Sequence, residues 1–447
     1  MKNSKKITIE IEKIVTGGYG LAHHKNDTYM VRGALEGEIV NIEPVCRKKN
    51  VIFATTDEVL KPSDDRVDSF CPYYGMCGGC VFQHMSYQKQ IETKVALTKE
   101  ILQRNADTVE PVVNKIFSSP QRHNYRKTAA FRVQDGKIGF FKENSHDLVQ
   151  VRDCMIIDNS INDIIPRLEE LARKYPTTIE INCIYSPYKN DLVLNVITSN
   201  KINNPGFIDK LLHRQRIKGI TFMKQSDRKI YLRRGSDSTV FAENRYRFRV
   251  HSAAFMQNNL SVYDAFYSSV SQYLTRDDNA YAIDIYSGTG FFTLLLAEYF
   301  NTVVSVESDY YSYRNALKNR NDNGFKNIHA VNTSIEDPQL KEKIPLKEAC
   351  HFNTALIDPP RNGLSQEAVD KIKSFLPETL IYVSCEPSTL ARDINRLRPQ
   401  YKFIETNIID SFPHTKHIET VSLFKLDPSR PREKLSIKTS VKSNIYQ

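Results

Sequence analysis

The C-terminal part of the chain, from His251 onward, alternates short apolar runs with helical segments. The apolar runs are YAIDIYSG, VVSVES, TALIDPP and LIYVSCE. Strands that alternate with helices are typical of a parallel sheet with crossover helices. In such a sheet the carboxyl ends of the strands share one edge, and open α/β folds bind their ligands there. The pattern therefore predicts an α/β domain at residues 251–430 with a ligand site at one edge of its sheet.

Two further regions precede this domain, and a short tail follows it. Residues 1–62 contain short alternating runs broken by glycines, a pattern that predicts a small antiparallel β-barrel. Residues 63–250 begin with a cysteine-rich loop and a helical stretch from Tyr87 to Arg104, and continue with runs such as RKTAAFRV and DLVLNVIT. This order predicts a mixed α+β central domain. Residues 431–447 are polar and basic, and a weakly ordered tail is expected.

The length and charge of the chain limit the classes of protein it can represent. A chain of 447 residues is too long for one compact core, so two or three domains are expected. Its 62 Lys and Arg residues exceed its 52 Asp and Glu residues, giving a net charge of +10 and a pI near 9.0. This balance favours a polyanionic partner such as nucleic acid, and a basic surface that is merely solvated remains the alternative. Arg47, Lys48 and Lys49 are candidates for phosphate contacts or form a solvated turn.

No segment of the sequence indicates secretion or insertion into a membrane. The N-terminus lacks the apolar stretch of a secretory signal, and no run approaches the length of a transmembrane helix. A cytoplasmic protein without a membrane partner is therefore expected.

The segment YAIDIYSGTGFF joins a strand ending at Asp284 to an apolar helix through Gly288 and Gly290. Glycines at such a strand-to-helix turn let the backbone approach a ligand closely, and an acid ending the next strand accepts hydrogen bonds from ribose hydroxyls. Glu307 in VVSVES stands at that position. The turn is shorter than a full G-x-G-x-x-G motif, which favours an adenosyl cofactor over a pyrophosphate. A purely structural glycine turn is the alternative.

Three more side chains with useful chemistry stand at strand ends. Asp358 precedes two prolines in ALIDPPRNG, and Cys385 ends the next strand, so both are expected on the edge that carries the glycine turn. Glu419, near His414 and His417, begins an apolar run and is a candidate general base. Taken alone, Cys385 is more often a small core residue and Glu419 a surface carboxylate. The shared edge is what favours Cys385 as a nucleophile.

The remaining cysteines form two groups. The first has C-x5-C-x2-C spacing with a distant fourth candidate ligand, and its members are Cys71, Cys77, Cys80 and Cys154. Four thiolates suit zinc or an iron–sulfur cluster, and the spacing does not decide between them. The second group has no such neighbours and is expected to pack in cores: Cys46, Cys183 and Cys350.

Together these motifs resemble the RNA uracil-5-methyltransferase family over nearly the whole chain. The stretch GGYGLAHHKNDTYMVRGALEGE resembles a TRAM domain, an OB-like RNA-binding barrel, and CPYYGMCGGCVFQHMSYQKQIETK resembles the family's iron–sulfur motif. The resemblance implies a class I, Rossmann-like methyltransferase domain that uses S-adenosyl-L-methionine. It also implies a [4Fe-4S] cluster held by Cys71, Cys77, Cys80 and Cys154.

The same resemblance implies roles for residues of the α/β domain. SCEPSTLARD is similar to the family's nucleophile motif at Cys385, and HIETV to its base motif at Glu419. FMQNN and DIYSGTGFF are similar to cofactor motifs, and the implied cofactor contacts are Gln257, Tyr286, Gly288, Phe291, Glu307, Asn332 and Asp358. Phe255 is implied to lie near the target base.

Two positions depart from the family's pattern. Glu386 stands where the family usually has Asn, and a carboxylate beside the thiol is expected to raise the pKa of Cys385 unless it points away. Phe291 replaces a polar residue of some members, so its contacts are expected to be backbone or packing contacts.

The implied activity is methylation of carbon 5 of a uridine in structured RNA. Carbon 5 is too weak a nucleophile to take a methyl group directly, but addition of a thiolate at carbon 6 gives an enolate that can. The TRAM and iron–sulfur parts favour 23S ribosomal RNA over transfer RNA as the partner, and a monomer is expected. Two other interpretations remain. One is an amino-group methyltransferase in which Asp358 carries the chemistry and Cys385 is structural, and the other is an RNA-binding assembly factor without transfer activity.

Overall fold

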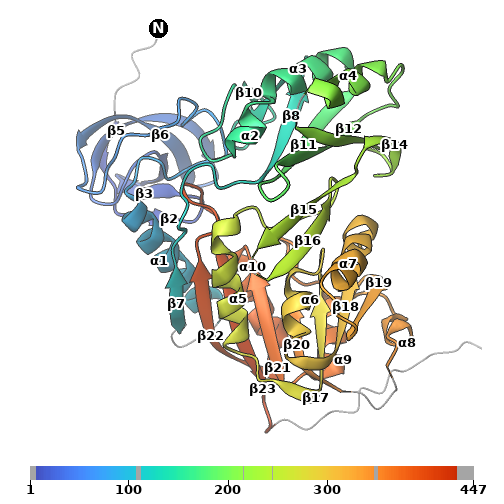
Figure 1. Ribbon diagram of the computed structural model, residues 1–447. Coiled ribbons are helices and arrows are strands. Elements are labelled where there is room, and N and C mark those ends of the chain that lie inside the picture. The colour runs from blue at the N-terminus through green and yellow to red at the C-terminus, as the bar shows by residue number, and fades with distance from the viewer. Residues whose placement is uncertain (1–6, 107–111, 215, 244, 347–350, 430–447) are drawn as a thin grey trace, which may run out of the picture.

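The computed structural model of the protein contains three large β-sheets, which form an N-terminal, a central and a C-terminal part (Figure 1). The structure describes residues 7–106, 112–214, 216–243, 245–346 and 351–429. Cys350 and the predicted tail at 431–447 lie outside the described residues. In the described part of the chain, no helix is long and apolar enough to cross a membrane.

The N-terminal part is a curled six-stranded sheet with strand order β1-β5-β6-β4-β3-β2. Its neighbouring strands are antiparallel except β4 and β6, which are parallel. After β1 the chain bends back, and Glu12 N donates to Leu21 O on β3 at 2.8 Å. The strands are β1 (Ile7–Glu10), β2 (Lys13–Val15), β3 (Tyr19–His24), β4 (Asp27–Arg32), β5 (Ile39–Lys48) and β6 (Val51–Lys61). The sheet of the predicted small antiparallel β-barrel is present and curled; it differs from the prediction in its parallel pair of β4 and β6, and among the described residues no pairing joins β1 to β2.

The outer half of β5 extends beyond the core of this sheet. Every residue from 43 to 48 is exposed, including Cys46, so the prediction that Cys46 packs in a core is wrong. Arg47 on the same ribbon forms an exposed ion pair with Asp27 at 2.8 Å. Cys183, in contrast, is fully buried in the central sheet, as expected of a packing residue.

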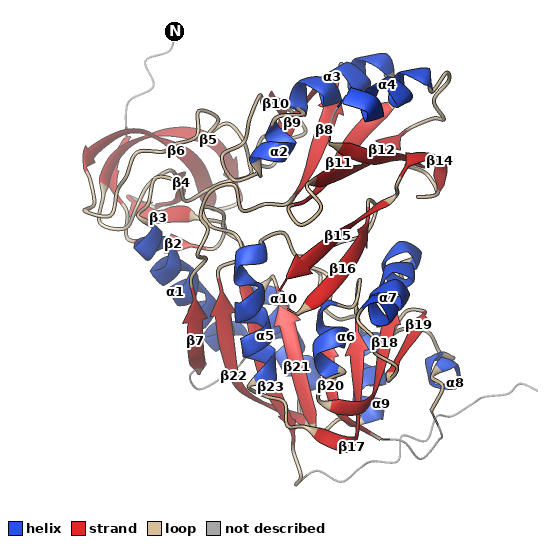
Figure 2. Cartoon of the chain, in the orientation of Figure 1, coloured by secondary structure: helices blue, strands red, loops and turns tan. Residues whose placement is uncertain are grey.

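The central part is a seven-stranded sheet with strand order β10-β9-β8-β11-β12-β13-β14, covered by three helices (Figure 2). A single apolar cluster joins the sheet to the helices, with Leu168 and Leu171 of α3 packed against Phe131 and Phe222. Its strands are β8 (Thr128–Gln134), β9 (Lys137–Phe141), β10 (Leu148–Gln150), β11 (Thr178–Ser186), β12 (Asp191–Thr198), β13 (Ile217–Lys224) and β14 (Ile230–Gly235). Its helices are α2 (Asn159–Asn162), α3 (Ile165–Lys174) and α4 (Gly206–Arg214).

The C-terminal part is an eight-stranded sheet with strand order β19-β18-β17-β20-β21-β23-β22-β7. The pairs are parallel except those that β23 makes with β21 and β22. The strands are β17 (Asp277–Ile285), β18 (Phe300–Glu307), β19 (Ile328–Asn332), β20 (Phe352–Ile357), β21 (Thr379–Ser384), β22 (Tyr401–Ile409) and β23 (Glu419–Leu426). Parallel strands joined by helices confirm the predicted α/β fold of this region.

Helices cover both faces of this sheet, because successive strand residues point to opposite sides. One face packs against η1 (Leu260–Val262), α5 (Tyr263–Ser271) and α6 (Phe291–Leu296). The other face packs against α8 (Leu340–Lys343), α9 (Gln366–Phe375) and α10 (Pro387–Leu397), together with the end of α1 (Tyr87–Asn105). Helix α7 (Tyr310–Asp322) follows β18.

Several segments from the predicted central interval pack onto the C-terminal sheet. Strand β7 (Val113–Phe117) pairs in parallel with β22, and the hairpin of β15 (Ser238–Glu243) and β16 (Tyr246–His251) shares an apolar cluster with α5 and α6. The predicted helix at Tyr87 to Arg104 is confirmed as α1, which begins after the cap Ser86. The division of the chain at residue 250 stays a prediction.

Candidate active site

The predicted site residues of the α/β region stand at one edge of the C-terminal sheet. Tyr286, Asp358 and Cys385 each directly follow the last residue of a parallel strand, β17, β20 and β21. Glu307 is the last residue of β18. Glu419 is the first residue of β23, and because β23 runs antiparallel to β21, its start lies at the same edge.

A cavity of about 770 Å³ opens over this edge. Eight of the nine predicted catalytic and cofactor residues line it: Gln257, Tyr286, Gly288, Phe291, Glu307, Asp358, Cys385 and Glu419. Phe255 also lines it and is 65% exposed, which leaves its ring accessible to a bound molecule. Asn332 is not among the lining residues. Its amide donates instead to Glu307 O at 2.8 Å.

The turn after β17 forms a cradle in the cavity wall. Tyr286, Gly288 and Gly290 all have positive φ, at 61°, 55° and 92°. A Cβ at Gly288 would meet no atom within 4 Å, so this position leaves open space beside the backbone. The hydroxyl of Ser287 is buried and has no hydrogen-bond partner. Open space, bare backbone and an unpaired hydroxyl fit the binding of a polar ligand.

Glu307 faces the cradle from the next strand. Its carboxylate accepts hydrogen bonds from Gly288 N at 2.8 Å and Asp309 N at 2.6 Å. Burial raises the pKa of Glu307, and these two backbone donors oppose that rise. Phe291 stacks on Tyr267 with ring centroids 4.8 Å apart, so its side chain packs as expected for an apolar residue at this position.

Cys385 and Glu419 are neighbours across two antiparallel strands. Ser384 pairs with Thr420, and Thr420 Oγ1 donates to Ser384 O at 3.2 Å. Cys385 follows one member of this pair and Glu419 precedes the other, so both face the cavity at the same level. On its other side Glu419 pairs with Ile409 of β22. Glu419 is only 4% exposed and is therefore not a surface carboxylate.

Burial dominates the electrostatics of this pair. It raises the pKa of Cys385 to about 12, with the carboxylates of Glu419 and Asp358 adding to the rise. Burial also raises the pKa of Glu419 well above its usual value and that of Asp358 to about 7. The guanidinium of Arg361 opposes the rise at both Cys385 and Glu419.

Arg361 is a further cavity residue whose only sequence signal is its position directly after the Asp-Pro-Pro motif, too weak a signal to predict a role. It lines the cavity, and its charge bears on both groups of the candidate pair. Glu386 has a smaller effect on the Cys385 pKa. Its Oε1 accepts from Ser388 Oγ at 2.8 Å, and together with Cys385 it lines a smaller cavity of about 140 Å³ beside α1 and the turn after β2.

A third cavity, of about 200 Å³, is lined by Cys71, Cys77, Cys80 and Cys154. The structure thus brings together all four cysteines of the predicted ligand set. Burial raises the pKa of Cys80 to about 12 and that of Cys154 to about 11. Within the described residues, no group of three or more His, Cys, Asp or Glu side chains is arranged to hold a metal ion.

Comparison with known proteins adds an independent line of argument. A family model described as tRNA (Uracil-5-)-methyltransferase matches residues 86–426. A 23S rRNA (uracil(1939)-C(5))-methyltransferase RlmD of Haemophilus parainfluenzae is 29% identical over 433 residues, which cover 95% of this chain and 97% of that protein. A protein of Aquifex aeolicus described as an uncharacterized RNA methyltransferase is 27% identical over 427 residues, covering 94% of this chain and 99% of that protein.

A similar fold is found among solved structures. The crystal structure of a Pyrococcus abyssi tRNA (uracil-54, C5)-methyltransferase in complex with S-adenosyl-L-homocysteine matches with a TM-score of 0.74 and 23% identity. The match covers 93% of this chain and 99% of that chain, so the two folds agree over nearly their full lengths.

Proposed function

Because this chain belongs to the tRNA (uracil-5-)-methyltransferase family, we propose that it methylates carbon 5 of a uridine in 23S ribosomal RNA, with Cys385 as nucleophile and Glu419 as base. Its class as an S-adenosylmethionine-dependent RNA (uracil-5-)-methyltransferase follows from the family match and the relatives. The residue roles and the RNA are the proposal. The observation that carries it is the convergence of Cys385 and Glu419 on one cavity with the Gly288 cradle.

The cavity residues suit S-adenosylmethionine, which when bound supplies a methyl group on a sulfonium centre. Glu307 would accept hydrogen bonds from the ribose hydroxyls, and the open side of Gly288 would admit the cofactor against the backbone. Gln257, Tyr286, Phe291 and Asp358 line the same space. Asn332 would act indirectly, through the hydrogen bond that its amide donates to the backbone carbonyl of Glu307.

The chain's own residues then carry out the covalent steps on uracil. The Cys385 thiolate forms a bond from Sγ to carbon 6, and the electron pair of the ring double bond moves into an enolate whose carbon 5 is nucleophilic. Once carbon 5 has gained the methyl group, Glu419 takes the proton from carbon 5. The electron pair left behind restores the double bond between carbons 5 and 6, and the bond from Sγ to carbon 6 breaks.

The four cysteines around the 200 Å³ cavity are proposed to hold a [4Fe-4S] cluster. Four thiols that line one space are a ligand set of the kind that a [4Fe-4S] cluster uses. Anaerobically purified protein should therefore show the visible absorbance of an iron–sulfur cluster. Protein that lacks both this absorbance and iron would contradict the assignment.

The choice of 23S RNA is supported by the Haemophilus relative, and the net charge of +10 suits an RNA partner of either class. Transfer RNA is the second candidate, because the Pyrococcus protein with the same fold is a tRNA methyltransferase by its description. We further propose that the protein acts as a monomer in the cytoplasm, where both RNA classes are found.

The decisive experiment is a covalent trap with 5-fluorouridine-substituted ribosomal and transfer RNA in the presence of S-adenosylmethionine. Fluorine at carbon 5 cannot leave as a proton, so a thiol that has added to carbon 6 stays attached. We expect a denaturation-resistant adduct at Cys385, and the trapped oligonucleotide identifies the uridine. An adduct with transfer RNA alone would replace the proposed substrate. No adduct with either RNA would make Cys385 structural, as in the amino-group methyltransferase interpretation.

A further inference from the structure

Residues 410–418, here called the base loop, connect β22 to β23 and lead directly into Glu419. Ile409 pairs with Glu419, so the loop between them begins at Asp410 and ends directly before Glu419. Phe412, Thr415 and His417 of this loop line the main cavity. The conformation of the base loop therefore determines one wall of the cavity and the direction from which the chain enters Glu419.

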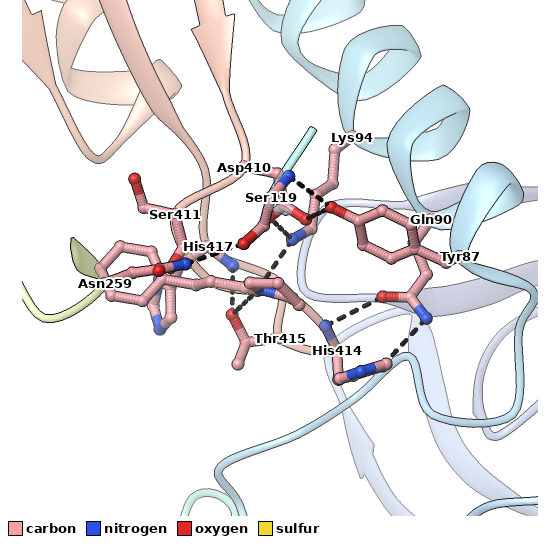
Figure 3. A network of polar contacts seen from close by, with 12 residues as sticks. Tyr87, Gln90, Lys94, Ser119, Asn259, Asp410, Ser411, His414, Thr415 and His417 are labelled. Atoms are coloured by element: carbon pink, nitrogen blue, oxygen red, sulfur yellow. Dashed lines mark hydrogen bonds and ion pairs between the residues drawn. The ribbon is translucent and has the colours of Figure 1, made fainter. Parts of the chain in front are cut away.

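Helix α1 holds the beginning of the base loop through a buried ion pair. Lys94 Nζ donates to Asp410 Oδ1 at 2.7 Å and to Phe412 O at 3.0 Å. The side chains of Lys94 and Asp410 are each 1% exposed. Tyr87, two turns earlier on α1, donates from its hydroxyl to Asp410 Oδ2 at 2.9 Å. Figure 3 shows both α1 side chains directed at Asp410.

The same helix also holds the middle of the base loop. His414 N donates to Gln90 Oε1 at 2.9 Å, and Gln90 Nε2 lies 3.2 Å from His414 Nδ1. His414 has a φ of 68°, an uncommon conformation for this residue type that needs support from its surroundings. Between these anchors, Ser411 O accepts from Asn259 and Pro413 O accepts from Tyr125. Contacts from outside the loop thus reach every residue from 410 to 414.

A buried ion pair by itself adds little to folding stability. Removing two charges from water is costly, and apolar residues of similar volume are often as stable in the same place. Lys94 does something that an apolar side chain cannot do, because it bonds a side chain and a backbone carbonyl of the same loop at once. Its arrangement fits a requirement for a fixed loop conformation.

We propose that Lys94, supported by Tyr87 and Gln90, is a positioning residue that holds the base loop so that Glu419 can take the proton from carbon 5 of the methylated uracil. This inference rests on the proposed function. It assigns α1 to the last chemical stage, in which the carbon 5 proton passes to Glu419 and the bond from Sγ to carbon 6 breaks. Addition of Cys385 to carbon 6 does not require Glu419 as a base, so it should be largely independent of Lys94.

The test compares two rates in one set of variants. The first is formation of the covalent adduct with 5-fluorouridine RNA, and the second is release of methylated RNA from unmodified substrate in a single turnover. For Lys94→Met we expect the adduct-forming rate to stay within about threefold of the native rate while release slows at least tenfold, on the scale of lost general-base catalysis of about 10²–10⁴. A covalent protein–RNA species carrying the methyl group should then accumulate.

Lys99→Met is the matched control, because Lys99 lies on the same helix and is exposed. It should keep both rates. Lys94→Met leaves Asp410 buried without its cation, so the double variant Lys94→Met/Asp410→Leu removes both charges and should show the same selective loss of release. Where either variant fails to fold, the same two rates are measured for Tyr87→Phe. This change deletes only the hydroxyl that is bonded to Asp410 and Ser119.

The outcomes separate this inference from the proposed function. If native protein forms no adduct, the proposed function fails. If native protein forms the adduct but the folded variants release product at the native rate, or lose both rates in parallel, Lys94 has no positioning role. Selective loss of release, with the adduct retained, supports it.

Discussion

Cys385 and Glu419 occupy adjacent positions across β21 and β23, and burial favours the uncharged form of both. A thiol must lose its proton before it can attack carbon 6, and a carboxyl group must be ionised before it can take a proton from carbon 5. Arg361 favours the charged form of both groups. Under the proposed function, the fraction of Cys385 present as thiolate would therefore limit the first covalent step.

This balance predicts how the first step depends on pH. With the pKa of Cys385 raised to about 12, the thiolate fraction increases as pH rises, throughout the neutral and mildly alkaline range. The adduct-forming rate with 5-fluorouridine RNA should thus rise about tenfold per pH unit between about pH 6.5 and 9.5. Quenched time courses analysed by mass spectrometry give this rate. A flat profile would show that RNA binding has already lowered the Cys385 pKa, and Cys385→Ala should give no adduct at any pH.

Glu386, the departure from the family pattern, should have little influence on this profile. Its carboxylate accepts from Ser388 Oγ, and among the carboxylates that raise the Cys385 pKa it ranks below Glu419 and Asp358. Replacing it in Glu386→Gln removes the charge and keeps the shape. We expect the adduct-forming rate at pH 8 to rise by less than about threefold, the direction expected when a nearby negative charge is removed. A rise of more than tenfold would mean that Glu386 faces the thiol.

At the scale of elements, α10 ties the nucleophile strand to the loop that carries Asp358. Asp393 on α10 is fully buried and accepts from Tyr382 OH on β21 at 2.8 Å and from Leu364 N at 2.8 Å. Arg392 and Arg396 complete its contacts. One carboxylate therefore fixes three segments of the cavity edge.

The Asp393→Ala variant should lose about 3 kcal/mol of unfolding free energy, because two buried donors are left without an acceptor. Chemical denaturation followed by circular dichroism measures the loss. Asp370→Ala on the exposed side of α9 is the control and should change the unfolding free energy by less than about 0.5 kcal/mol. Equal stability of the two variants would mean that water replaces the Asp393 carboxylate as the acceptor for these two donors.

Elements built from local pattern were predictable, and contacts between distant segments were not. The alternation of strands and helices after His251 predicted the C-terminal sheet, and strand ends predicted that Asp358 and Cys385 share an edge. Nothing in the periodicity predicted that β7 joins this sheet beside β22. Lys94 and Asp410 are 316 positions apart, and a buried Lys on a helix gives no sequence signal of its partner. Nor does the alternation in the N-terminal part predict that β4 and β6 pair in parallel.

At the scale of the whole molecule, the three sheets meet beside the base loop. An apolar cluster joins Ile14 and Leu35 of the N-terminal sheet to Val81, Phe82 and Met85, with Leu97 of α1 packed against it. A Cβ at Gly18 would lie 3.0 Å from both Val81 and Phe82 side chains, so the sheet approaches this segment closely. The segment directly follows Cys80, which places the cysteine loop at the junction of all three parts.

At this junction, segments next to the cysteines contact the base loop directly. Val81 N and Phe82 N both donate to His414 O at 3.0 Å, and the ring of Phe70, next to Cys71, lies 4.8 Å from that of His414. If the four cysteines hold iron, its removal releases the chain next to Cys71 and next to Cys80, where these contacts are made. The base loop then loses the Val81 and Phe82 contacts at His414, while the Gln90 contacts at His414 and the Lys94 contacts at Asp410 remain.

Removal of iron by a chelator under anaerobic conditions should therefore loosen a defined set of amides. Hydrogen exchange at Val81 and Phe82 should accelerate by at least tenfold, about 1.4 kcal/mol of local stability, whereas amides in α9 of the C-terminal part should keep their rates. The 5-fluorouridine adduct should still form, and release of methylated RNA should slow, because His414 supports the base loop and not the thiol. Unchanged exchange at both amides after the visible absorbance has disappeared would show that the apolar cluster alone holds this segment, and that the iron site and the base loop are independent.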